Sequence, residues 1–385
     1  MDVLMECCCG LDIHRDMVEA CILKGTLEET QTIREQFHTT RKELSRLTRW
    51  LHENGCRHIA MESTGVYWRP VYETIETESA GYDCLMVVNA RHMRNLPGRK
   101  SDAKDAEWIA TLLRHGLLES SFIPERDIRD LREFTRMRRV TVQERNRHIN
   151  RLEKFLQTHG FKLSSVLSDI LCVSGRKLLN TLAQTGKLSP EDVYEAAGRR
   201  LKRPMEEITA AVCGSLNRPE QAMLQLLLKK LEDADTDLAF IDEQMAEFSQ
   251  AYEREVALLD SIPGIDILSA VTLLGEIGPA PQQSFPTPGH LTSWAGLTPR
   301  NDESAGKVKS RKILPGNPYI KALLCQVAWV AVKVRGSPFH TWFWSHQGRL
   351  GRKKAIIAVS RKILKLIYRL LETGLPYTPE RTALA

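Results

Sequence analysis

Long hydrophobic runs are absent from this sequence. The longest apolar stretch without a formal charge, residues 322–332, covers 11 residues, well short of the roughly 18 that cross a bilayer. The first residues also lack the basic segment, the apolar segment and the small-residue cleavage site of a secretory signal. These absences predict a cytoplasmic protein with no membrane partner.

Metal-binding and redox cysteine patterns are absent too. The nine cysteines form no C-x-x-C pair, and Cys56 with His58 has no second ligand pair at zinc spacing. No G-x-x-x-x-G-K-[ST] loop occurs. We therefore expect no structural zinc site, no disulfide framework and no ATP-binding loop of that kind.

The chain is long and apolar enough for several globular domains. It contains 385 residues, of which 42% are hydrophobic and 26% charged. At roughly 150 residues per domain, this length predicts two or three domains rather than one small module.

Positive charge is concentrated near the C-terminal end. Residues 300–371 hold 16 Lys and Arg against two acids, a local charge of +14, whereas the whole chain carries +6 and the remainder −8. An ordinary protein surface mixes charges of both signs. A cluster of one sign, by contrast, favours binding to a polyanion, because the bound cations release the counterions condensed on it. Nucleic acid is therefore the leading partner class, with a merely solvated basic surface as the alternative.

Residues 1–125 alternate between strand-like and helix-like segments. Strands are expected at 3–11, 17–23, 58–61 and 82–88, and helices at 39–54, 67–77 and 103–115. The first two strands flank a short polar turn, which favours a hairpin. This order predicts an α/β domain with a mixed sheet.

Residues 126–258 are expected to be helical. Apolar residues recur at heptad spacing over 128–156, where Arg138 and Arg145 interrupt the seam, and more regularly over 224–248. The repeat predicts coiled-coil helices, with an intramolecular antiparallel helix pair as the alternative.

Residues 259–375 are expected to form an all-α C-terminal domain, and residues 376–385 a tail. A basic loop at 299–317 interrupts the helices, and Pro and Gly residues mark its exit.

Four acids in the α/β domain stand where a metal site needs them. Asp12 and Glu62 follow apolar strands, and Asp102 and Asp105 lie three residues apart, on one face of the helix that they open. Such a cluster would repel itself unless cations neutralised it, and two Mg²⁺ ions would do so while clamping a phosphodiester. For each acid alone, a helix cap or a solvated surface residue is the alternative.

Several motifs together resemble the DEDD insertion-sequence transposases, a family that includes bridge-RNA-guided recombinases. They are Gly10-Leu11-Asp12, Met61-Glu62-Ser63-Thr64-Gly65 and the segment from Gly98 to Ala106. The resemblance implies an RNase H-like (RuvC-like) fold similar to Holliday-junction resolvases for the N-terminal domain. It also implies that Asp12, Glu62, Asp102 and Asp105 are catalytic metal ligands.

The second half of the chain resembles the C-terminal transposase domain of the same family. The matching motifs are Ile262-Pro263-Gly264-Ile265, the segment from Trp294 to Pro299, and Glu303-Ser304-Ala305-Gly306-Lys307 with Gly316-Asn317. The resemblance implies that Ser304 attacks the DNA phosphodiester. From the residues alone, a serine in a loop rich in cations and glycine also fits simple phosphate binding.

Basic side chains near Ser304 and at the start of the last helix are the candidate nucleic-acid contacts. A solvated basic face is the alternative for the second group. The residues are Lys307, Lys309, Arg311, Lys312, Arg349, Arg352, Lys353 and Lys354.

The predicted function is that of a nucleoid-associated recombinase that cuts and rejoins DNA to move an insertion sequence. The resemblance implies donor and target DNA, a structured guide RNA, two Mg²⁺ ions and a homo-oligomer, a dimer or tetramer, as partners. The alternatives are an RNA-independent DNA invertase of the same family, a metal-dependent junction nuclease, a non-catalytic nucleic-acid scaffold and a sugar-kinase or actin-like ATPase. The last is disfavoured because the Gly-rich phosphate and adenosine loops that such an ATPase carries further along its chain are lacking.

Overall fold

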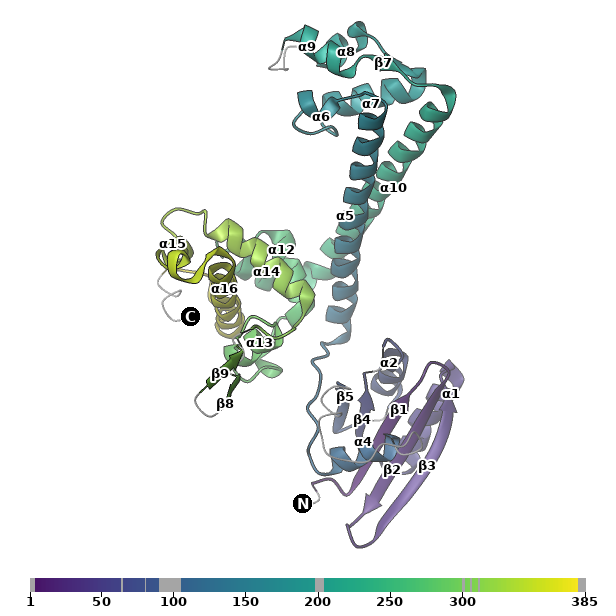
Figure 1. Cartoon of the computed structure of the whole chain (residues 1–385). Helices are drawn as coiled ribbons and strands as arrows, with labels where there is room; N and C mark the ends of the chain where they lie inside the picture. Colours follow the sequence, from purple (N-terminus) through teal and green to yellow (C-terminus); the bar gives the residue numbers. More distant parts are fainter. Residues whose placement is uncertain are drawn as a thin grey trace. The chain divides into compact units, whose positions relative to one another are not determined.

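The computed structural model describes residues 4–63, 65–79, 81–89, 105–197, 204–299, 302–304, 307–310 and 312–379. The chain divides into two compact units, Met1–Ile123 and Pro124–Ala385 (Figure 1). Asp102 and Arg311 lie outside the described residues.

The first unit is built on a five-stranded mixed sheet, as the sequence predicts. The strand order is β3-β2-β1-β4-β5. β1 pairs antiparallel with β2 and parallel with β4, which in turn pairs parallel with β5. The bounds are β1 Cys7–Ile13, β2 Met17–Gly25, β3 Thr30–His38, β4 His58–Glu62 and β5 Cys84–Val88.

Alternating side chains of β1 serve two different cores. Leu11 and Ile13 pack with apolar residues of α1 (Arg41–Glu53) and α2 (Trp68–Glu78). Cys8 packs with α4 (Asp105–Arg114) in a separate cluster. Because successive side chains of a strand face opposite ways, α1 and α2 cover one face of the sheet and α4 covers the other.

Strand β3 has no counterpart among the strands predicted from the sequence. This edge strand pairs with β2 over its whole length, but it is polar and mostly exposed, with only Phe37 fully buried. Its backbone partner, rather than an apolar pattern, makes it a strand.

The second unit begins with an antiparallel pair of long helices, α5 (Arg126–Thr158) and α10 (Arg218–Ser249) (Figure 1). Arg138 bonds Asp242 at 2.6 Å and Arg145 bonds Asp235 at 2.5 Å, so ascending positions on α5 meet descending positions on α10. The intramolecular alternative is therefore the one that holds. The two arginines that interrupt the apolar seam are ion-pairing residues between the helices.

The segment between α5 and α10 has a hydrophobic core of its own. Four short helices and a two-stranded sheet pack leucines against the ends of the long helices. They are α6 Leu163–Val166, α7 Val173–Thr185, α8 Pro190–Ala197, α9 Met205–Val212, β6 Lys187–Leu188 and β7 Gly214–Ser215.

The C-terminal part is mostly helical. Its helices are α11 Glu253–Asp260, α12 Ile267–Ile277, α13 Pro288–Trp294, α14 Pro318–Ala331, α15 Pro338–Leu350 and α16 Arg352–Thr373. The all-α prediction was wrong for the basic loop, where β8 (Asp302–Ser304) and β9 (Lys307–Ser310) form a hairpin. In the described part of the chain, no helix is both long and apolar enough to cross a membrane.

Candidate active site

Asp12 and Glu62 lie at the same edge of the sheet. β1 and β4 are parallel neighbours in which Leu11 pairs with Met61, so the acids that follow these two residues come side by side. Cys8 of β1 and Ala60 of β4 both pack against α4. Asp12 is separated from Cys8, and Glu62 from Ala60, by an even number of positions along the strand. Strand periodicity therefore puts both acids on the face that α4 covers.

The third acid, Asp105, is the first residue of α4, which lies directly against β1. A Cβ atom on Gly10 would stand 2.1 Å from the Ala106 carbonyl oxygen and 2.5 Å from the Ala110 nitrogen. Only glycine permits this approach. It brings the start of α4 to the end of β1, where Asp12 stands.

The pKa of Asp12 depends on both of the other acids. Asp12 is only 6% exposed. Burial is the largest effect and raises the pKa of Asp12. His14, whose Nε2 atom lies 3.2 Å from Asp12 Oδ2, acts to lower this pKa, whereas the negative charges of Asp105 and Glu62 raise it further. A cation at this edge would relieve the same repulsion.

Three of the four predicted ligands are thus gathered, while Asp102 lies outside the described residues. In the described part of the chain, no three Asp, Glu, His or Cys side chains are close enough to hold a metal ion by themselves. The donors that are gathered are carboxylate oxygens, the donor type that Mg²⁺ prefers over sulfur or nitrogen.

Two neighbours of Asp12 escaped the sequence analysis. His14 contacts Asp12 directly, and Glu19 stands opposite it in the β1–β2 register. The polar turn between the two strands was the available signal, because fixing the hairpin register around it would have paired Asp12 with Glu19.

A substitution at Gly10 tests the contact between α4 and β1. Gly10→Ala is expected to lower the free energy of unfolding by about 1 to 3 kcal/mol, because the methyl group meets the backbone of α4. Urea denaturation measures this loss. Gly348→Ala is the matched control, because Gly348 lies inside α15 and a Cβ atom there would meet open space. Since alanine favours a helix over glycine, this control should raise the free energy of unfolding by about 0.5 to 1 kcal/mol. Equal midpoints for Gly10→Ala and the unsubstituted protein would contradict the packing.

The predicted nucleophile, Ser304, ends strand β8 of the second unit. Ser304 pairs with Lys307 across the hairpin, and Lys309 lies further along β9. Beyond the hairpin, Pro299 and Ile313 form an antiparallel bridge, and Lys312 is exposed. Ser304 thus lies at the end of a strand, paired with one cation and followed in sequence by others.

Two glycines let the ends of this segment cross. A Cβ on Gly316 would stand 2.2 Å from the Gly296 nitrogen, and one on Gly296 would stand 2.7 Å from the Gly316 nitrogen. The backbone of the following residue, Asn317, donates to the Trp294 carbonyl at 3.3 Å. We call this contact between residues 294–296 and 316–317 the base of the hairpin, because the two chain segments that lead into and out of the hairpin touch there through their backbones.

The remaining basic candidates cluster where two helices meet. Arg349 lies in the last turn of α15, and Arg352, Lys353 and Lys354 form the first turn of α16, all of them exposed. Cations at a helix N-terminus oppose the helix dipole. The positive potential of these four side chains suits a phosphate.

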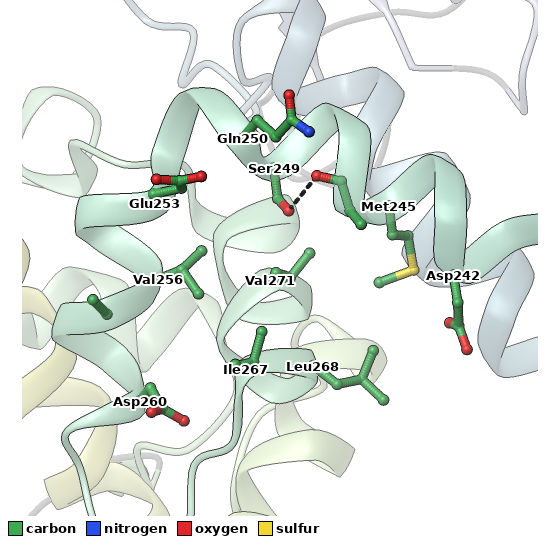
Figure 2. Close-up of a pocket in the computed structure, with 12 residues that line it drawn as sticks. Asp242, Met245, Ser249, Gln250, Glu253, Val256, Asp260, Ile267, Leu268 and Val271 are labelled. Atoms are coloured by element: carbon green, nitrogen blue, oxygen red, sulfur yellow. Dashed lines mark hydrogen bonds between the residues drawn. The ribbon is translucent and has the colours of Figure 1, made fainter.

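A cavity of about 580 Å³ between α10, α11 and α12 has the wrong chemistry for a nucleic-acid site. Figure 2 shows Met245, Val256 and Val271 lining it, with the carboxylates of Asp242 and Glu253 beside them. These carboxylates would repel phosphate.

Comparisons with known proteins find two family profiles in the chain. A profile described as a DEDD transposase matches residues 9–160, and one described as a transposase of the IS116/IS110/IS902 family matches residues 256–342. The first spans the strands that carry Asp12 and Glu62, and the second spans the hairpin that carries Ser304.

Individual relatives have similar descriptions. The chain is 26% identical over 258 residues to a putative transposase, y4rJ, of Sinorhizobium fredii, covering 66% of this chain and 60% of that protein. It is 25% identical to the transposase for insertion sequence element IS1533 of Leptospira borgpetersenii, covering 70% and 68%. It is 27% identical to a pilin gene-inverting protein of Moraxella bovis, covering 39% and 47%.

Proposed function

Because the chain belongs to the IS116/IS110/IS902 family of transposases, we propose that it cuts and rejoins DNA strands to move an insertion sequence. The chain spans only 60% of the Sinorhizobium relative, so the activity of the whole protein is part of this proposal. The observation that carries it is that Asp12, Glu62 and Asp105 lie at the same edge of the sheet, with Asp12 buried.

In this proposal the sheet edge holds Mg²⁺, with Asp102 completing the ligand set. The hard oxygen donors fit that ion, and buried Asp12 needs a compensating charge. When bound, Mg²⁺ would supply positive charge to the phosphodiester oxygens. The part of the four acids is to fix that charge at one place on the sheet.

Ser304 is the proposed nucleophile. Its Oγ attacks phosphorus and loses its proton, the phosphodiester bond breaks, and the leaving DNA oxygen takes up a proton as a hydroxyl. A hydroxyl from another strand then attacks the phosphoserine and releases Ser304. Each step exchanges one phosphate ester for another, so rejoining needs no ATP. The nearby cations Lys307, Lys309, Arg311 and Lys312 would offset the charge that develops on the phosphate.

The proposal includes a structured guide RNA, donor and target DNA, and a homo-oligomer. Lys312, Arg349, Arg352, Lys353 and Lys354 support only the nucleic-acid part of the proposal, because all five are exposed and therefore accessible to a phosphate backbone. A second candidate is an RNA-independent invertase, which the printed name of the Moraxella relative favours.

Nuclease treatment of the purified protein separates the two candidates. With an RNA guide, a defined RNA copurifies with the protein, and RNase digestion lowers strand exchange at least about tenfold. Adding back that RNA, identified by sequencing, should restore exchange, whereas an unrelated RNA of equal length should not. Undiminished exchange after complete digestion would favour the invertase. Cleavage without any rejoining would indicate a metal-dependent junction nuclease.

A further inference from the structure

We infer that Glu276 is a positioning residue that fixes the base of the Ser304 hairpin through Asn317. The inference rests on the proposed role of Ser304 and adds a residue that no motif singled out. Glu276 lies near the end of α12, is only 1% exposed, and is far from Ser304 in sequence.

The carboxylate of Glu276 is held from two sides. Arg136 of α5 donates to its two oxygens from Nε at 2.8 Å and from a terminal nitrogen at 2.9 Å. Asn317 donates its side-chain amide to the second oxygen at 2.5 Å. One buried carboxylate therefore joins three segments that are distant in the chain: α5, α12 and the exit of the hairpin.

Asn317 cannot turn its amide without losing other bonds. Its side-chain oxygen accepts from the backbone nitrogens of Tyr319 at 2.9 Å and Ile320 at 3.2 Å, which caps α14. Its amide nitrogen therefore has to face Glu276. The same residue follows Gly316 at the crossing with Gly296, so Glu276 determines where the chain leaves the hairpin.

The arginines fix Glu276 in turn. Arg132 donates to the carbonyl oxygens of Gly275 and Glu276, both at 2.8 Å. Burial lowers the pKa of Arg132 to about 10. Burial also acts to lower the pKa of Arg136, but the bonds and charge of Glu276 outweigh it and raise that pKa. Arg136 also lies over the ring of Tyr319, 4.3 Å from its centroid.

Stability alone is a poor explanation for this cluster. Buried ion pairs cost desolvation energy, and apolar residues of the same volume often stabilise a core equally well. The hydrogen bond from the Asn317 amide to the buried Glu276 carboxylate is directional. It therefore fixes both the distance and the orientation of Asn317, which an apolar contact would not do. Catalysis needs such precision, because a shift of about 1 Å in a reacting group can cost about 100-fold in rate.

Swapping the two partners tests the inference. Glu276→Gln removes the charge, and Asn317→Asp keeps the helix cap but sets a second carboxylate against Glu276. Each single variant is expected to lower the single-turnover rate of covalent adduct formation, at saturating DNA, by about 10- to 100-fold, with DNA affinity changed less than about threefold. In the double variant the new amide donates to the new carboxylate, so the rate should recover at least about tenfold.

Hydrogen exchange supplies a readout that does not depend on activity. Backbone amides of residues 297–316 should exchange faster in Glu276→Gln than in the unsubstituted protein, while those of α16 should not. Glu243→Gln, an exposed change of the same type on α10, is the control and should alter neither rate nor exchange.

Two results would overturn the inference. The first is that both single variants form the covalent adduct at a rate within twofold of the control, with unchanged hydrogen exchange in residues 297–316. The other is a double variant no faster than the slower single variant. If instead Ser304→Ala still forms the adduct, the proposed nucleophile is wrong, while the exchange measurement still decides whether Glu276 fixes the hairpin.

Discussion

Ser304→Ala is expected to abolish recombination and the covalent protein–DNA adduct together. The change deletes the Oγ atom that attacks phosphorus and removes nothing else, so DNA and RNA affinity should change less than about twofold. Denaturing electrophoresis of the protein with labelled DNA detects the adduct, and a strand-exchange assay measures recombination. We expect a fall of at least about 1,000-fold in both.

Two neighbouring variants make this test specific. Ser304→Cys retains a nucleophile with a different size and pKa and should keep a trace of adduct formation. Ser310→Ala removes the same atom from the other strand of the hairpin and should form the adduct normally. An adduct that persists in Ser304→Ala would refute the assignment and direct the search to Ser310 and Thr298.

Neutralising any one of the four acids is expected to abolish strand exchange with the fold intact. Asp12→Asn, Glu62→Gln, Asp102→Asn and Asp105→Asn each remove a charge with little change in size, so each weakens the proposed Mg²⁺ site. Chelation of divalent ions should inactivate the unsubstituted protein to the same extent. Full exchange by any two of the four variants would disprove the tetrad.

Asp12→Asn should also stabilise the metal-free protein. Burial and the charges of Asp105 and Glu62 outweigh His14 and raise the pKa of Asp12, which means that folding disfavours its ionised form. Removing the charge therefore removes an unfavourable term at pH values where Asp12 is ionised. Thermal unfolding without divalent ions should show a higher midpoint for Asp12→Asn, whereas Glu28→Gln, an exposed control, should leave midpoint and activity unchanged.

The sequence predicted well the elements whose burial leaves a periodic pattern. The β1–β2 hairpin, β4, β5 and the long helices α5 and α10 all have apolar spacing that matches their geometry. It did not predict β3 or the β8–β9 hairpin, because their short or exposed strands consist largely of polar residues and depend on backbone pairing.

The candidate site divides in the same way. Asp12 and Glu62 could be found because each ends an apolar run of the sequence, and the parallel pairing of β1 with β4 then puts them side by side. Glu276 could not be predicted as a site residue, because in the sequence it is a single acid near the end of an apolar helix. Its partners Arg136 and Asn317 are distant in sequence, and only the folded chain makes the three a unit.

The ion pairs between α5 and α10 constrain how this protein could change its dimensions. Arg138 and Arg145 are seven residues apart on α5, and so are their partners Asp235 and Asp242 on α10. An insertion of one or two residues in either helix would turn every later side chain away from its partner. An insertion of seven residues in both helices at once would keep the two ion pairs in register. An insertion of three or four residues would instead have to be absorbed by local overwinding or unwinding of the α5–α10 pair, so the length of this pair is easiest to change by whole heptads.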